Sequence, residues 1–146
     1  MTTAAVVYRS RTGTTRRYAE AIGEYLRSRG VEVTVASVGD ANAAAVGRAD
    51  LVLLGCWTSG LFVVRQHPDE PWLAFVRELP QLEGARVGLF TTYRLATGSM
   101  FRRMRDALAS RVRTIGVELR SRDGGLSESD RRALQAFIEA DGTKRT

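Results

Sequence analysis

The sequence predicts an α/β protein in which helices cover both faces of a parallel sheet. Short runs of aliphatic and β-branched residues alternate with longer amphipathic segments, a pattern typical of repeated units of strand, crossover helix and strand. Most of the short runs are continuously apolar, as strands are when both faces of the sheet are buried. The 146 residues, of which 44% are hydrophobic, fit a single domain over residues 1–146.

The short apolar runs predict five strands. Each run is rich in aliphatic or β-branched residues and is separated from the next by a segment of helical periodicity. The strands are expected at Ala4–Tyr8, Val31–Ser37, Leu51–Leu54, Arg86–Thr91 and Thr114–Leu119.

Five helices are predicted between and after these strands. The first has the clearest periodicity, because Tyr18, Ile22 and Leu26 fall on one face. Gly30 suits a left-handed end for this helix, and Ser127 or its neighbour is expected to cap the last one. The helices are expected at Thr14–Arg29, Ala43–Gly47, Pro71–Glu78, Met100–Val112 and Glu128–Ala140.

The chain carries a net charge of +6, with 22 basic residues against 16 acidic ones. Such a balance points to nucleic acid, an anionic surface or an acidic protein as a partner. The excess lies between Arg94 and Arg122, where eight arginines stand against two acidic residues. The basic residues are not interleaved with aromatic ones in a nucleic-acid-binding motif, so nucleic acid is not expected as a partner.

The composition also excludes several classes of protein. No apolar run approaches the roughly 20 residues of a membrane-spanning helix, so no membrane insertion is expected. The N-terminus lacks the features of a signal peptide, and we expect a cytoplasmic protein. Cys56 is the only cysteine and His67 the only histidine, so neither a disulfide nor a cysteine- or histidine-rich metal site is expected.

A hydroxyl-rich segment with a glycine follows the first predicted strand and leads into the first helix. Hydroxyls and backbone amides at the start of a helix can bind a phosphate group, which the helix dipole also favours. The ending of a Walker loop and the spaced glycines of a dinucleotide-binding loop are both absent. We therefore predict a phosphate site of another kind rather than a simple helix cap. Its residues are Ser10, Arg11, Thr12, Gly13, Thr14 and Thr15.

This segment resembles the phosphate loop of the flavodoxin family, whose Thr/Ser-x-Thr-Gly-x-Thr pattern directly follows the first strand. Ser10, Thr12, Gly13 and Thr15 match the pattern, and Thr14 takes its variable place. Two further segments, 55–60 and 91–98, are similar to the family's flavin loops after the third and fourth strands. The resemblance implies a three-layer flavodoxin-like fold of the short-chain type, with a five-stranded parallel sheet in the order 2-1-3-4-5.

The resemblance also implies FMN as the cofactor and one-electron transfer between redox partner proteins as the function. The hydroxyls of the first loop would hold the phosphate, and Trp57 and Tyr93 are candidates to stack on the flavin ring. Gly60 aligns with a family glycine whose preceding carbonyl, here that of Ser59, turns to accept a hydrogen bond from reduced flavin N5. No catalytic residue is expected, because the chemistry belongs to the flavin. The implied cofactor-binding residues are Ser10, Arg11, Thr12, Gly13, Thr14, Thr15, Cys56, Trp57, Thr58, Ser59, Gly60, Thr92, Tyr93, Arg94, Leu95 and Gly98.

The chain departs from the family pattern in three places. The stretch Leu61-Phe62-Val63-Val64 is more apolar than the acidic segment expected after the glycine. Leu95 stands where short-chain relatives often have a ring-stacking aromatic side chain. The acidic rim of relatives is replaced by Arg65, Arg94, Arg102 and Arg103. Because reduced FMN is anionic, these arginines are expected to raise the potential of the second reduction step, and they favour an acidic docking surface on the redox partner.

Two other functions stay open on the sequence alone. The chain could be a binding or regulatory module that keeps the fold but has lost flavin, as Leu95 suggests. It could also be a small oxidoreductase acting on a quinone or another small acceptor. A response-regulator receiver is excluded because Gly55-Cys56 stands where its phosphoacceptor Asp would be, and a small tyrosine phosphatase is excluded because the first loop has no cysteine.

Three further residues are given structural interpretations. Cys56 is expected to be a buried core thiol, because a lone cysteine at the end of a buried strand behaves as a small hydrophobic residue. His67 is expected at the surface. Trp72 is expected in the core or at its rim rather than against the cofactor.

Overall fold

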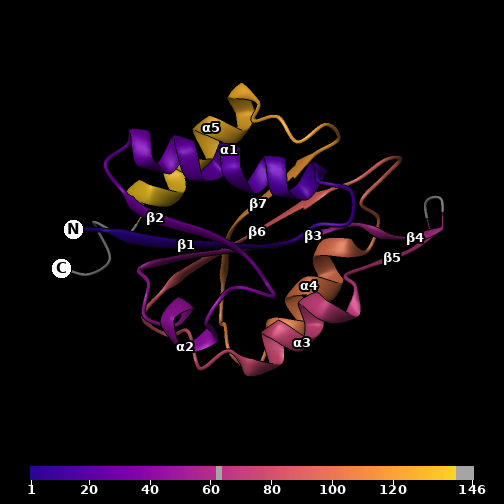
Figure 1. The fold of residues 1–146 in the computed structure, drawn as a ribbon, viewed down its shortest axis with the longest axis horizontal. Coiled ribbons are helices and arrows are strands. Elements are labelled where there is room, and N and C mark those ends of the chain that lie inside the picture. Colours follow the sequence, from indigo (N-terminus) through magenta and orange to yellow (C-terminus); the bar gives the residue numbers. More distant parts are fainter. Residues whose placement is uncertain (62–63, 141–146) are drawn as a thin grey trace.

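A five-stranded parallel sheet forms the middle layer of the protein (Figure 1). The computed structural model describes residues 1–61 and 64–140, and for residues 59–61 and 64–65 it describes the backbone only. The strands of the sheet pair in the order β2-β1-β3-β6-β7, and every neighbouring pair is parallel, which confirms the predicted order 2-1-3-4-5 of the five parallel strands. They are β1 (Thr3–Arg9), β2 (Glu32–Ser37), β3 (Leu51–Trp57), β6 (Arg86–Thr92) and β7 (Ile115–Ser121).

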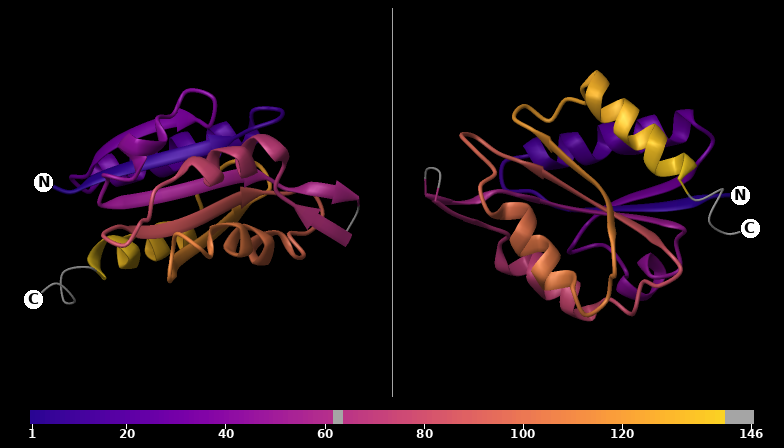
Figure 2. Two further views of the ribbon diagram at one scale, coloured as in Figure 1. Left: turned by 90° about the horizontal axis from the view of Figure 1, so that it is seen from below. Right: turned by 180° about the vertical axis from the view of Figure 1, so that it is seen from behind.

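Helices cover both faces of the sheet, as predicted (Figure 2). Two lie on one face, where Tyr18, Ile22 and Leu134 pack with the sheet into one apolar cluster. Three lie on the other face, where Trp72 and Met104 belong to a second cluster. The first pair is α1 (Thr14–Ser28) and α5 (Glu128–Glu139), and the other three are α2 (Ala43–Val46), α3 (Glu70–Glu78) and α4 (Met100–Leu108).

The predicted fourth helix was too long at its C-terminal end. It was expected to reach Val112, but α4 ends at Leu108. The carbonyl of Leu108 accepts hydrogen bonds from the amides of Arg111 and Val112, and the carbonyl of Arg111 accepts one from Leu82. The carbonyl of Arg111 thus bonds to a distant residue rather than within a helix, and helical periodicity in the sequence does not reveal such a contact.

A short antiparallel hairpin lies outside the main sheet and was not predicted. It consists of β4 (Ser59–Leu61) and β5 (Val64–His67) and extends the chain after β3 (Figure 1). The Ser99 hydroxyl, at the start of α4, donates a hydrogen bond of 2.9 Å to the carbonyl of Gln66 in β5. The hairpin is therefore anchored to the loop that follows β6.

A capping box starts α5, as the sequence led us to expect for Ser127. The Ser127 Oγ accepts a hydrogen bond of 3.0 Å from the Asp130 amide, and the Asp130 carboxylate accepts one of 3.2 Å from the Ser127 amide. Asp130 also accepts a bond of 2.8 Å from the buried Tyr18 hydroxyl of α1. The cap therefore fixes α5 against α1 as well as starting the helix.

We expect Ser127→Ala to lower the free energy of unfolding by about 1 kcal/mol, because it removes the side-chain acceptor at the N-cap. Urea denaturation followed by circular dichroism measures the loss. Ser129→Ala is the control, since Ser129 is exposed in the same first turn and makes no capping bond. Equal losses in the two variants would contradict the role of the cap.

Candidate functional site

The carboxyl ends of β1, β3 and β6 lie side by side at one edge of the sheet (Figure 1). β1 stands between β2 and β3, so the winding of the chain reverses here, and open α/β sheets bind ligands at such a point. Residues 10–15 follow β1, residues 58–60 follow β3, and residues 93–98 follow β6. The structure therefore brings together the three segments that the sequence singled out.

The first loop, residues 10–15, forms the turn that starts α1. The Ser10 Oγ accepts hydrogen bonds from the amides of Gly13 (3.0 Å) and Arg16 (3.3 Å). Gly13 is the N-cap residue and has a φ of 98°. The first amides of a helix have no intrahelical acceptor, and the first turn of α1 contains no acidic residue. This loop fits a phosphate group, which would accept from the remaining amides and match the helix dipole.

Threonine hydroxyls fasten the three loops to one another. Thr15 is buried, and its Oγ1 lies 2.6 Å from the Oγ1 of Thr92 at the end of β6. The Thr58 amide donates a bond of 2.8 Å to the Thr92 carbonyl, and the Thr58 hydroxyl pairs with that of Thr91 at 2.8 Å. Thr15 and Thr92, both predicted site residues, therefore face each other inside the protein and fix the spacing of the loops.

Cys56 is buried, as predicted for a core thiol. Its Sγ donates to Asp69 Oδ1 at 3.6 Å, and burial raises the pKa of the thiol well above its usual value. A thiol held protonated in this way is a poor nucleophile. Cys56 is therefore part of the core below the carboxyl edge.

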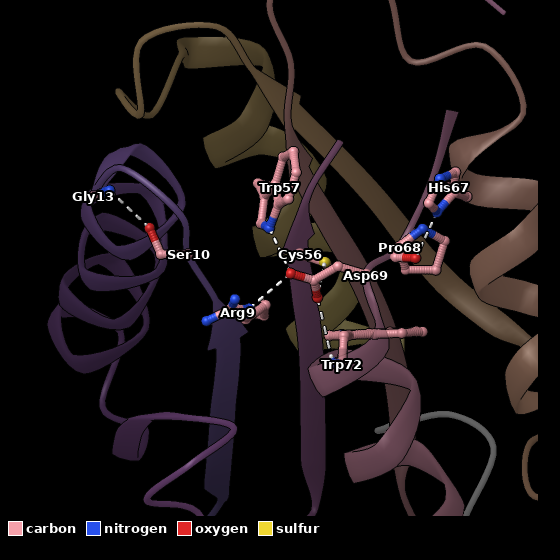
Figure 3. Close-up of polar contacts among 9 residues, drawn as sticks. All are labelled: Arg9, Ser10, Gly13, Cys56, Trp57, His67, Pro68, Asp69 and Trp72. Atoms are coloured by element: carbon pink, nitrogen blue, oxygen red, sulfur yellow. Dashed lines mark hydrogen bonds and ion pairs between the residues drawn. The ribbon is translucent and has the colours of Figure 1, made fainter. Parts of the chain in front are cut away.

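Asp69 is the main residue of this edge that sequence reasoning missed (Figure 3). Its Oδ2 accepts bonds of 2.8 Å from Arg9 Nε and of 2.8 Å from Trp57 Nε1, and its side chain is only 14% exposed. It is also the N-cap residue of α3, where it accepts from the Trp72 amide. An Asp two residues before a proline signals a helix start, but no sequence pattern showed its bonds to Arg9, 60 residues away, and to Trp57.

Two arginines lie over the two aromatic rings that were candidates for stacking on flavin. The Arg11 guanidinium lies 5.1 Å from the centroid of the Trp57 ring, and that of Arg122 lies 5.4 Å from the centroid of Tyr93. Trp57 thus borders the first loop, and Tyr93 borders the loop that follows β7. Arg122 was not among the predicted site residues, and stacking of either ring on flavin stays a prediction.

The remaining predicted residues lie on the outer side of the edge. Leu95 is 59% exposed, and Arg94 beside it is exposed as well. Gly98 lies against the side chain of Gln66 in the hairpin. The predicted turning carbonyl of Ser59 precedes Gly60 in β4, but the side chains of this segment lie outside the described residues, as does that of Arg65.

The structure also places the two remaining residues that received a structural interpretation. His67 is exposed, as predicted, with its Nδ1 2.9 Å from the carbonyl of Pro68. Trp72 is fully buried in the core, and its Nε1 has no hydrogen-bond partner among the described residues.

In the described part of the chain, no group of three His, Cys, Asp or Glu residues could hold a metal ion. Nor does any described helix have the length and apolarity needed to cross a membrane.

The excess of arginine between residues 94 and 122 is divided between the carboxyl ends and the amino ends of the strands. Arg94 and Arg122 lie at the carboxyl edge, next to the loops of the site. Arg111, beyond the end of α4, donates to the carbonyls of Arg77 and Leu79, and Arg113 lies just before β7 begins. Because α4 runs from the carboxyl ends of the strands to their amino ends, only part of the arginine excess lies next to the loops of the site.

Gly13→Ala and Gly30→Ala form a matched pair for testing the first loop. Both glycines have a positive φ, 98° and 83°, and open space where a Cβ would stand. Alanine in this conformation costs roughly 1–2 kcal/mol, so both variants are expected to lose that much stability in urea denaturation. Only Gly13→Ala is expected to weaken the binding of FMN as well, by roughly tenfold in a flavin fluorescence titration. Equal weakening by Gly30→Ala, at the far end of α1, would contradict the assignment of the loop.

Comparison with known proteins agrees with this geometry. The family model described as flavodoxin matches residues 6–139. The chain is 33% identical over 112 residues to a flavodoxin from Megasphaera elsdenii, covering 77% of each chain. It is 32% identical over 98 residues to a flavodoxin from Clostridium beijerinckii, covering 66% of this chain and 69% of that one.

Among solved structures, a short-chain flavodoxin associated with a bacterial microcompartment superposes with a TM-score of 0.74. It is 26% identical in sequence, and the match covers 95% of both chains. The sheet order, the three loops at its carboxyl edge and these likenesses agree with one another. The chain therefore belongs to the flavodoxin family, and its cofactor is FMN.

Proposed function

We propose that this flavodoxin, an FMN-binding electron-transfer protein, docks acidic redox partners through a basic surface beside the flavin. The observation that carries the proposal is the position of three arginines at the carboxyl edge. Arg11 comes from the first loop, Arg94 from the loop after β6 and Arg122 from the loop after β7. All three are exposed, and none of them forms an ion pair with an acidic residue in the described part of the chain.

The residues at the edge fit FMN. The start of α1, with Thr12 and Thr14 beside Gly13, would hold the phosphate, and the exposed Leu95 and the half-buried Tyr93 offer apolar surface to the ring. An exposed leucine at a ligand-binding edge is consistent with cover by a bound group. This fit favours a flavin-binding protein over a module that has lost flavin.

When bound, FMN supplies the chemistry of accepting and releasing electrons. The protein's own residues bind and orient it: the loop of residues 10–15 receives the anionic end, and the threonine pairs keep the three loops at fixed spacing. The exposed arginines act on the partner. A charge at the rim adds little affinity, but it steers an oppositely charged protein towards the site where electrons cross.

Electron transfer to small oxidants of opposite charge tests the sign of this surface. We expect the reduced protein to react with ferricyanide at a rate that falls as salt is raised, since salt screens the attraction between arginines and an anion. With the cationic tris(phenanthroline) complex of cobalt(III), the rate is expected to rise with salt. Arg94→Gln and Arg122→Gln should flatten both dependences, while Arg113→Gln, at the opposite edge, should leave them unchanged. Salt dependences of the opposite sign would overturn the proposal.

The same arginines are expected to affect the redox potential. A positive charge stabilises the anionic reduced flavin, so Arg94→Gln should lower the potential of the second reduction step, by roughly a few tens of millivolts because exposed charges are screened. Spectroelectrochemistry measures the shift, with Arg113→Gln as the control. An unchanged potential in Arg94→Gln would contradict an effect of Arg94 on the reduced flavin. The salt dependence measured above would then decide whether Arg94 acts on redox partners.

A further inference from the structure

The indole of Trp57 lies between the first loop and the start of α3. Its ring faces the Arg11 guanidinium of the first loop, 5.1 Å from the ring centroid. Its Nε1 donates a bond of 2.8 Å to the Asp69 carboxylate at the N-terminus of α3 (Figure 3). Trp57 thus connects a residue of the phosphate loop with a carboxylate on a different element.

Asp69 is held in place by donors from several directions. Arg9, the last residue of β1, donates to the same Oδ2 that receives the Trp57 indole, and Cys56 and the Trp72 amide donate to Oδ1. A carboxylate this well satisfied, with a side chain only 14% exposed, has little freedom to turn. The indole bonded to it is therefore fixed in orientation as well.

The fixed indole in turn limits the motion of Arg11. An exposed arginine has many rotamers, and ordering it costs conformational entropy. A guanidinium that stacks on an indole face keeps its charge in one region, and tryptophan is the best aromatic partner for such a contact. Arg11, itself a residue of the loop that starts α1, is thereby kept over Trp57.

We propose that Asp69 is a positioning residue for the phosphate end of the flavin site. It holds the Trp57 indole, the indole holds the Arg11 guanidinium, and the guanidinium keeps a positive charge beside the phosphate loop. The consequence is selectivity for FMN over riboflavin, which has the same ring but no phosphate. The proposal rests on the FMN-binding function stated above and deepens it by assigning a source for this selectivity.

The variant Asp69→Asn separates this role from that of a helix cap. Asparagine is as good an N-cap as aspartate, so α3 should still start at the same place. It lacks the charge that holds Arg9 and cannot accept from Arg9 and Trp57 with the strength of a carboxylate. Glu70→Gln is the matched control, because Glu70 is the next residue in the chain and its carboxylate pairs with the exposed Arg77.

The first measurement uses protein without flavin. In a Trp72→Phe background Trp57 is the only tryptophan. Phenylalanine loses no hydrogen bond of the indole, because Trp72 Nε1 has no partner among the described residues. It does leave a cavity in the core, so every variant is compared with this Trp72→Phe protein as the parent. We expect acrylamide to quench the Trp57 fluorescence more strongly in Asp69→Asn than in the parent, and equally in Glu70→Gln and the parent. If acrylamide quenches Trp57 equally in Asp69→Asn and in the parent, the proposal is overturned.

The second measurement compares FMN with riboflavin. The ratio of the riboflavin to the FMN dissociation constant is expected to fall about fivefold in Asp69→Asn and in Arg11→Gln. Since Asp69 acts through Arg11, the double variant Asp69→Asn/Arg11→Gln should have the same ratio as Arg11→Gln alone. A merely structural loss would instead lower the affinity for both flavins and leave the ratio unchanged. If Asp69→Asn does not fold, Trp57→Phe, which lacks the N–H donor, replaces it in the same cycle.

The outcomes are distinguishable. An unchanged ratio in the single variants, or an additive fall in the double variant, would overturn the positioning role while leaving the electron-transfer function intact. A parent chain that binds neither FMN nor riboflavin would overturn the function, and the positioning role with it. In that second case, increased acrylamide quenching in Asp69→Asn would show only that Asp69 holds the Trp57 indole.

Discussion

The parallel pairing of β1, β3 and β6 is the constraint on which the site depends. Its register places Arg9 opposite Cys56, and Cys56 opposite Thr91, at the point where the three strands end. Strands buried on both faces cannot slide without moving every side chain of two apolar clusters. The loops that leave these strands therefore start from fixed positions, and short polar contacts are enough to set their relative geometry.

Two kinds of polar contact fix the loops further, beyond what the strand register does. Hydroxyl pairs among threonines join the loops at neutral groups, which are inexpensive to bury when each is paired. The carboxylate of Asp69 joins β1, the end of β3 and the start of α3 through one charged donor, Arg9, and neutral donors that include the Trp57 indole. The same carboxylate buried without Arg9 would be costly. The rigidity of the edge is therefore built from the inside, while the arginines that face a partner remain at its rim.

Local signals in the sequence predicted the fold almost completely. Continuous apolar runs, the periodicity of α1 and the cap at Ser127 depend on neighbouring residues, and the structure confirms them. The three loops were found because each follows a predictable strand. The early end of α4 and the bonds of Asp69 were missed because they depend on contacts between residues far apart in the chain, which a single sequence does not show. The hairpin of β4 and β5 is local, but its strands of 3 and 4 residues are too short to give a clear alternating pattern.

The pairing of Thr15 with Thr92 joins positions 77 residues apart by a bond in which either oxygen could be the donor. Each hydroxyl has one proton and can accept from others. If the Thr15 hydroxyl donates its hydrogen bond to an anion, Thr92 must be the donor within the pair, so Thr92 can no longer donate elsewhere. A hydrogen bond from Thr15 to an anion in the first loop would thereby set the direction of the Thr92 hydroxyl at the end of β6, through the ordering of one proton and with no movement of the backbone.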